Sequence, residues 1–143
     1  MSMYDTFSTD KQSETEGVWV DYGQFRVRLA RAGGANKNYQ KQLERISRPY
    51  RRAIATDSLD PQVASGILKK TYAKAVITGW EVMRDDEFVS GIDQPDIDEP
   101  APFNEENVLK ALTDLDDLFL DLQSQASGIA LYRAGLREDA AGN

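Results

Sequence analysis

Charged side chains at helical spacing are the features of this sequence that could carry out chemistry. One set is a row of cations in the first half of the chain: Lys37, Lys41, Arg45, Arg48 and Arg52. At 100° per residue this basic stripe shares one face of a helix, and such a face can follow a phosphate backbone. The stripe has no interleaved aromatic side chain, and a net charge of −7 opposes nucleic-acid binding. We therefore favour a solvated face, or one that meets acids of the same chain or of a neighbour.

Carboxylates form the second candidate set. Asp114, Asp117 and Asp121 follow one another at i, i+3 and i+7, on one side of a predicted helix. Paired carboxylates can coordinate a hard cation or divide acid and base roles. The same spacing is typical of a solvated acidic face. The acids of residues 93–99 do not match the pattern of a calcium-binding loop, which needs a central Gly and a terminal Glu at set positions. We predict no metal site and no cofactor.

The chain contains neither cysteine nor histidine. Their absence excludes a disulfide framework, a thiolate nucleophile and a zinc–thiolate site. It also excludes a His-dependent catalytic triad and removes the commonest metal ligand. Because an enzyme would have to work with carboxylates, Lys, Tyr or Ser alone, we predict a non-enzymatic protein.

Length and composition indicate one domain. A chain of 143 residues with 41% hydrophobic residues can bury one core. No apolar run approaches the roughly 18 residues of a membrane span, and the N-terminus lacks the pattern of a secretory signal, so we expect a cytosolic protein. The expected divisions are a disordered acidic leader over 1–16, a single helical domain with an N-terminal β-hairpin over 17–136, and a flexible tail over 137–143.

Residue periodicity predicts the elements of this domain. Residues 17–32 alternate, with Phe25, Val27 and Leu29 on one face and Gly23 at the reversal, which is typical of a β-hairpin. Asn36 is a suitable N-cap for a helix that continues toward Ile54, with a kink or a new start at Pro49.

The sequence predicts mainly helices for the second half of the chain. Asp60-Pro61 opens a long helix whose apolar side, including Trp80 as a core residue, extends to near Met83. Residues 85–102, with three prolines and seven acids, are predicted to be a loop. A short helix covers 103–112, and a last helix capped by Asp114 extends to Gly135. The expected fold is mainly α, in the α+β class: an N-terminal β-hairpin followed by a bundle of about four to five helices.

The last predicted helix has apolar residues on two sides. Leu120 and Leu131 lie opposite its main apolar stripe, with Ser124 and Ser127 between them. A helix of this kind is either central in the fold or contacts a partner, and a chain of this size has few places to bury both sides. We favour a partner surface formed by these four residues.

Several short motifs resemble those of one known family. They are Gly17-Val18-Trp19-Val20, the run from Phe25 to Gly33, the helix start from Asn36 to Tyr39, the segment from Tyr72 to Trp80, and Phe103-x-x-Glu106-Asn107. Their order resembles the tail assembly chaperones of long-tailed, siphophage-type bacteriophages. The leader over 1–16 and the loop over 85–102 are extended relative to that family.

The resemblance implies a non-enzymatic protein of the host bacterial cytoplasm that binds the tape-measure protein and keeps it soluble. It also implies a protein absent from the mature virion, with a longer frameshifted form that binds the tail tube protein. We expect a homo-oligomer. Two alternatives stay open: a small structural tail or connector protein retained in the virion, and a nucleic-acid-binding regulator that uses the basic segment 26–52.

Overall fold

The computed structural model describes residues 2–135. Its centre is a four-stranded antiparallel sheet in the order β1-β2-β3-β4. The strands are β1 (Val18–Asp21), β2 (Phe25–Leu29), β3 (Ile77–Arg84) and β4 (Glu87–Ser90). A separate two-stranded hairpin consists of β5 (Ile92–Gln94) and β6 (Ile97–Ala101).

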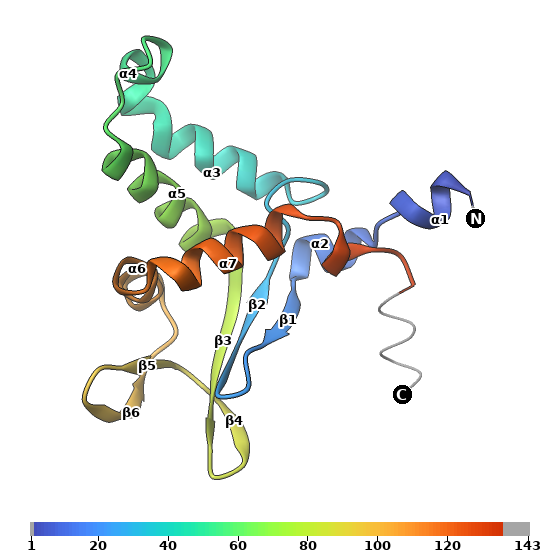
Figure 1. The fold of residues 1–143 in the computed structure, drawn as a ribbon, viewed down its shortest axis with the longest axis vertical. Helices are drawn as coiled ribbons and strands as arrows, with labels where there is room; N and C mark the ends of the chain where they lie inside the picture. Colours follow the sequence, from blue (N-terminus) through green and yellow to red (C-terminus); the bar gives the residue numbers. More distant parts are fainter. Residues whose placement is uncertain (1, 136–143) are drawn as a thin grey trace.

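Helices occupy three parts of the chain. α1 (Met3–Phe7) and α2 (Lys11–Glu16) precede the sheet. Between β2 and β3 come α3 (Lys37–Ser47), the 3-10 turn η1 (Arg48–Tyr50), α4 (Arg51–Ala55) and α5 (Pro61–Ala75). After β6 come α6 (Glu105–Asp114), α7 (Asp116–Ser127) and the 3-10 turn η2 (Ala130–Tyr132). Figure 1 shows α7 across one end of the sheet and the α3–α4 arm extending away from it.

The predicted helical bundle is wrong. About 52% of the described residues are helical and 23% lie in strands, so the fold is an α+β mixture built on a sheet. The N-terminal hairpin is confirmed: β1 pairs with β2, with Val20 opposite Val27, and the chain reverses through Gly23 at φ 91°. Val27 and Leu29 are buried, as their alternation predicts.

The long helix predicted to reach Met83 ends at Ala75, and the chain continues as β3. Val76, Trp80 and Met83 fit helical spacing, and for this reason the sequence pattern predicted a helix where the structure has a strand. Burial along β3 instead alternates over much of its length, because successive side chains of a strand point to opposite faces of the sheet. The strand is central and pairs with both β2 and β4. Gly79 permits this packing, since a Cβ there would lie 2.9 Å from the Trp19 ring.

The loop predicted over residues 85–102 is wrong as well, because this segment forms β4 and the β5–β6 hairpin. Asp85, Asp86 and Asp96 take left-handed backbone conformations at the two turns, where Asp is among the better-tolerated non-Gly residues. Pro100 lies within β6, a strand with a single partner that can spare one backbone donor. Acids and prolines concentrate here because the hairpins are exposed.

The last predicted helix is two elements. α7 ends at Ser127 rather than Gly135, and Asp114 ends α6 instead of capping α7. Beyond Gly128, η2 brings Tyr132 into the core, where its hydroxyl donates to the Leu29 carbonyl at 3.0 Å. The predicted flexible tail over 137–143 lies outside the described residues.

Two short helices, α1 and α2, stand where a disordered leader was predicted over residues 1–16. α2 is held by Glu14, whose buried carboxylate accepts hydrogen bonds from Arg31 at 2.8 Å and Thr9 at 2.9 Å. Burial opposes ionisation of Glu14, but these hydrogen bonds outweigh it and hold its pKa below the ordinary value of 4.5.

Asn36 is the N-cap residue of α3, as predicted, but its side chain makes no capping bond. Its amide instead donates to the carbonyls of Arg31 and Ala75, each at 2.8 Å. This buried side chain therefore joins the segment that leaves β2 to the end of α5.

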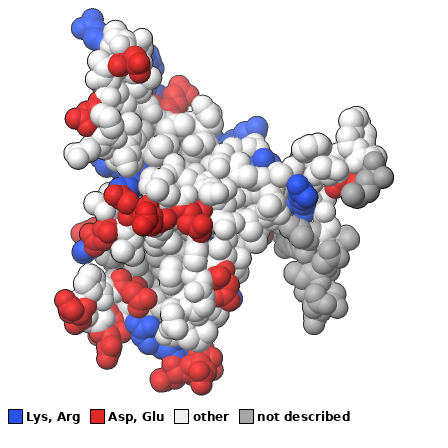
Figure 2. Space-filling model, in the orientation of Figure 1, with Lys and Arg blue, Asp and Glu red and all other residues white. Residues whose placement is uncertain are grey.

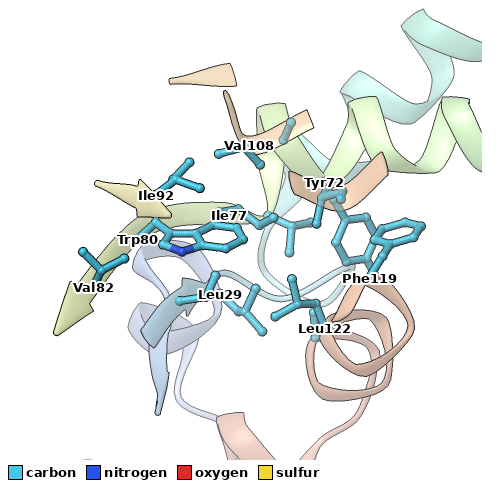
Figure 3. Close-up of a cluster of buried hydrophobic side chains, with 14 residues drawn as sticks. Leu29, Tyr72, Ile77, Trp80, Val82, Ile92, Val108, Phe119 and Leu122 are labelled. Atoms are coloured by element: carbon cyan, nitrogen blue, oxygen red, sulfur yellow. The ribbon is translucent and has the colours of Figure 1, made fainter. Parts of the chain in front are cut away.

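The hydrophobic core lies between the sheet and α5, α6 and α7 (Figure 3). Its larger members are Val27, Leu29, Tyr72, Val76, Ile77, Trp80, Val82, Ile92, Val108, Leu112, Phe119 and Leu122. Trp80 is 4% exposed and stacks on Phe25 with ring centroids 6.0 Å apart. Its assignment to the core is confirmed, although it reaches the core from a strand.

Replacing Trp80 with Ala should lower the free energy of unfolding by about 3–5 kcal/mol, since it empties the centre of the core. Chemical denaturation followed by circular dichroism measures the change. Leu115→Ala, at a residue that is largely exposed, is the matched control and should hardly move the midpoint. Similar midpoints for the two variants would contradict the packing described.

Glu14 should make stability depend on pH. Because the pKa of Glu14 is lowered in the folded state, its stabilising contribution is present above its ordinary pKa of 4.5 and is lost as the pH falls through the folded-state pKa. Wild type should thus exceed Glu14→Gln in unfolding free energy at about pH 7, and the gap should close toward about pH 3. A gap that stays constant over this range would refute the role given to the Glu14–Arg31 pair.

Candidate partner-binding groove

A groove runs between α5 and α7. One part is a hollow of about 520 Å³, lined by Pro61, Gln62, Ser65, Gly66, Lys69, Thr113 and Asp116. An adjoining hollow of about 360 Å³ shares Ser65 and Asp116 and is otherwise lined by Leu68, Phe119, Leu120 and Gln123. The two hollows adjoin at these shared residues, and together they are called the α5–α7 groove.

Local sequence explains why the groove is open. Asp60 caps α5 by accepting from the Gln62 backbone N–H at 2.7 Å, and Pro61 occupies the first turn. Gly66 then lies inside the helix, and a Cβ built there would meet nothing within 4 Å. A glycine within a helix costs stability relative to Ala, and no packing among the described residues requires this one.

Lys69 contributes the charge in the groove. Its side chain is largely buried, and Nζ lies 2.8 Å from Oδ1 of the exposed Asp116. The same ammonium lies 5.7 Å from the centre of the Phe119 ring. The stem of Lys69 therefore covers apolar surface while its charge is held at the α7 side of the groove.

The four predicted partner residues do not form one line. Leu120 is 61% exposed at the groove, and Ser124 and Ser127 are exposed on α7. Leu131 lies in η2, beyond the end of α7, where it is half-buried against the core. The eleven-residue spacing places the two leucines on one face only if the helix continues to Leu131, and α7 ends at Ser127.

The basic stripe faces solvent over three elements. Lys37, Lys41 and Arg45 lie on α3, Arg48 on η1 and Arg52 on α4, and all five are exposed. None of them makes an ion pair with another residue in the described range 2–135.

The three candidate carboxylates have separate surroundings. Asp114 pairs with Lys110 at 2.6 Å, Asp117 is exposed on α7, and Asp121 accepts a hydrogen bond from the Tyr22 hydroxyl. Burial, reinforced by this bond to Asp121, raises the pKa of the Tyr22 phenol. Across residues 2–135, no three acidic side chains are arranged to hold a metal ion.

Sequence reasoning missed most of the groove. Ser65 and Phe119 carried no functional signal by residue type, and no sequence pattern singled out Lys69. The usable signal was Gly66, because an isolated glycine inside a helical pattern often has a packing or binding reason.

Comparison with known families gives the class of protein and then the family. The chain is a phage-derived protein. It belongs to the YdaY prophage protein family, whose model matches residues 34–143. No curated protein and no solved structure matches this chain. Within the described range, none of the helices is long and apolar enough to cross a membrane.

Leu120 and Leu131 should respond differently to the same substitution. Leu120→Asp should change the unfolding free energy by less than about 0.5 kcal/mol, because the side chain is exposed. Leu131→Asp should cost several times more, since it brings a carboxylate to the edge of the core. Thermal unfolding of both variants measures the difference, and equal losses would show that Leu120 is packed within the subunit.

Proposed function

We propose that this protein is a tail assembly chaperone that binds the tape-measure protein of its phage through the α5–α7 groove. The groove carries the proposal: it combines an open helix backbone at Gly66 with an exposed apolar rim at Leu120. The same proposal includes a longer form that binds the tail tube protein, a location in the host cytoplasm and absence from the mature virion.

Membership of a prophage protein family supports the phage setting that this function requires. The chemistry of the groove supports a helical client. A tape measure is a long helical chain with apolar seams, and helix-in-groove docking pairs such a seam with an apolar groove. Gly66 lets a client helix approach the α5 backbone closely, while Leu68, Phe119 and Leu120 offer apolar contacts.

The Lys69–Asp116 ion pair can orient the client helix in the groove. The pair lies where the two hollows meet, with Lys69 largely buried and Asp116 exposed. A polar group of the client at this point can bond the free lone pairs of Asp116. The pair would thereby fix the client's register, because an apolar seam alone specifies position poorly.

Gly66→Gln separates binding from folding. The longer side chain should fill the groove, yet it should raise the stability of α5, since Gln is a better helix former than Gly by about 0.5–1 kcal/mol. Co-expressed with the tape-measure protein, wild type should keep the client soluble and co-purify with it. Gly66→Gln and Leu120→Asp should lose both properties while remaining folded.

Phe7→Asp is the matched control, because Phe7 is equally exposed but lies on α1, away from the groove. It should retain the client. Full client solubility with Gly66→Gln and Leu120→Asp combined would overturn the groove as the binding site. Presence of the protein in purified particles would instead favour a structural tail component, and a salt-dependent shift of mixed DNA would favour a nucleic-acid-binding regulator.

A further inference from the structure

Two surfaces of opposite charge lie at opposite ends of the molecule. The basic arm is the exposed set of cations on α3, η1 and α4: Lys37, Lys41, Arg45, Arg48, Arg51 and Arg52. The acidic end is the set of exposed carboxylates on the β3–β4 turn, β4 and the β5–β6 hairpin: Asp85, Asp86, Glu87, Asp93, Asp96, Asp98 and Glu99. α4 and β4 stand at the two ends of the longest axis in Figure 1, and acidic side chains gather at the lower end in Figure 2.

The basic arm carries little counter-charge of its own. Glu44 is the one acid in residues 37–55, and none of the six cations makes an ion pair within the part of the chain that the structure describes. α3, η1 and α4 contain no buried residue. Tyr50 and Ile54 are exposed on the arm, and Ile54 lines a small hollow of about 130 Å³ together with Glu44, Ser47, Arg48 and Arg51.

The acidic end is held in one arrangement by Arg84. Its Nη2 pairs with the Asp93 carboxylate at 2.7 Å and donates to the Asp98 carbonyl at 2.9 Å. These contacts join β3 to the β5–β6 hairpin. The other six carboxylates make no ion pair within residues 2–135. Asn or Gly would fit the left-handed turn positions with less strain, but the chain places charged Asp85, Asp86 and Asp96 there.

Apolar side chains accompany the charge on both surfaces. The basic arm exposes Tyr50 and Ile54, and the acidic end exposes Val89 and Ile97, with Ile54 and Ile97 each about half exposed. An interface typically buries such residues at its centre and keeps charged residues at its rim. The two surfaces thus have opposite charge, and both offer apolar residues for the centre of an interface. Two copies of the same surface would instead repel each other.

We propose that the basic arm of one copy docks on the acidic end of the next copy. Because the two surfaces differ and lie at opposite ends, the contact is heterologous, and each bound copy still presents a free arm or a free acidic end. The protein therefore assembles head to tail. This interface is independent of the α5–α7 groove, so its failure would leave the proposed function standing.

Salt provides the first test. At about 50 mM salt, where screening is weak, wild type should sediment or elute as an assembly of two or more copies, and at about 500 mM it should dissociate at least tenfold more readily. Multi-angle light scattering gives the mass at each concentration of salt. A mass of one chain at low salt and high protein concentration would overturn the proposal.

Charge reversal provides the second test. Arg45→Glu with Arg48→Glu should make the protein monomeric, as should Asp98→Lys with Glu99→Lys, since each pair opposes like charges across the interface. Mixing the two variants should restore assembly, because the reversed arm of one then meets the reversed end of the other. A contact between two arms would instead leave the Asp98→Lys, Glu99→Lys variant assembled, because its arm is unchanged.

Lys11→Glu with Lys70→Glu is the control for the arm variant, with the same change in net charge at two exposed lysines outside both surfaces. It should assemble as wild type does, and circular dichroism should show all variants folded. Loss of assembly in this control would assign the effect to net charge alone and would overturn the interface. So would mixed variants that remain monomeric although each is folded.

Discussion

The structure depends on closing one long excursion of the chain. β2 and β3 are neighbours in the sheet, yet the whole helical arm and α5 lie between them in sequence. Holding the ends of such a segment together costs chain entropy, and interactions near the two ends must offset this cost. Asn36 does this by donating to carbonyls at both ends, Arg31 and Ala75, and the Ala30 backbone N–H adds a bond to the Val76 carbonyl at 2.7 Å. Both carbonyls would otherwise lie in a region with little access to water.

This closure decides where the surfaces of the molecule lie. With the ends of the excursion fixed at the sheet, α3 and α5 must leave it side by side, and the tip of the arm projects away from the core (Figure 1). The sheet's apolar side is covered by α5, α6 and α7, and the β3–β4 turn and the β5–β6 hairpin lie toward the end of the molecule opposite α4. The groove between α5 and α7 lies where these two parts of the fold meet. Separation of basic and acidic surfaces is therefore a result of topology, not of composition alone.

Sequence patterns correctly predicted the parts of this fold in which the spacing of apolar residues fitted only one type of secondary structure. The alternation around Val27 and Leu29 and the start of α5 at Asp60-Pro61 hold in the structure. The burial of Trp80 also holds, although Trp80 lies in a strand and not in the predicted helix. Prediction failed where two periods overlapped, as at Val76, Trp80 and Met83, which satisfy helical spacing while lying in or next to a strand. It failed again where exposed edge hairpins carried the acids and proline expected of a loop. Apart from the signal at Gly66, the groove could not be foreseen, because it depends on an α5–α7 contact that local sequence does not encode.

The family match begins at residue 34, after both strands of the first hairpin. Those strands nevertheless supply Val27 and Leu29 to the core and satisfy one whole edge of the central strand β3. A shortened chain restricted to the matched region would expose that edge as a row of unpaired backbone donors and acceptors. Such a strand accepts complementation by any extended peptide of suitable pattern. The first hairpin therefore keeps this side of β3 from pairing with foreign strands, while β1 becomes the edge strand of the sheet.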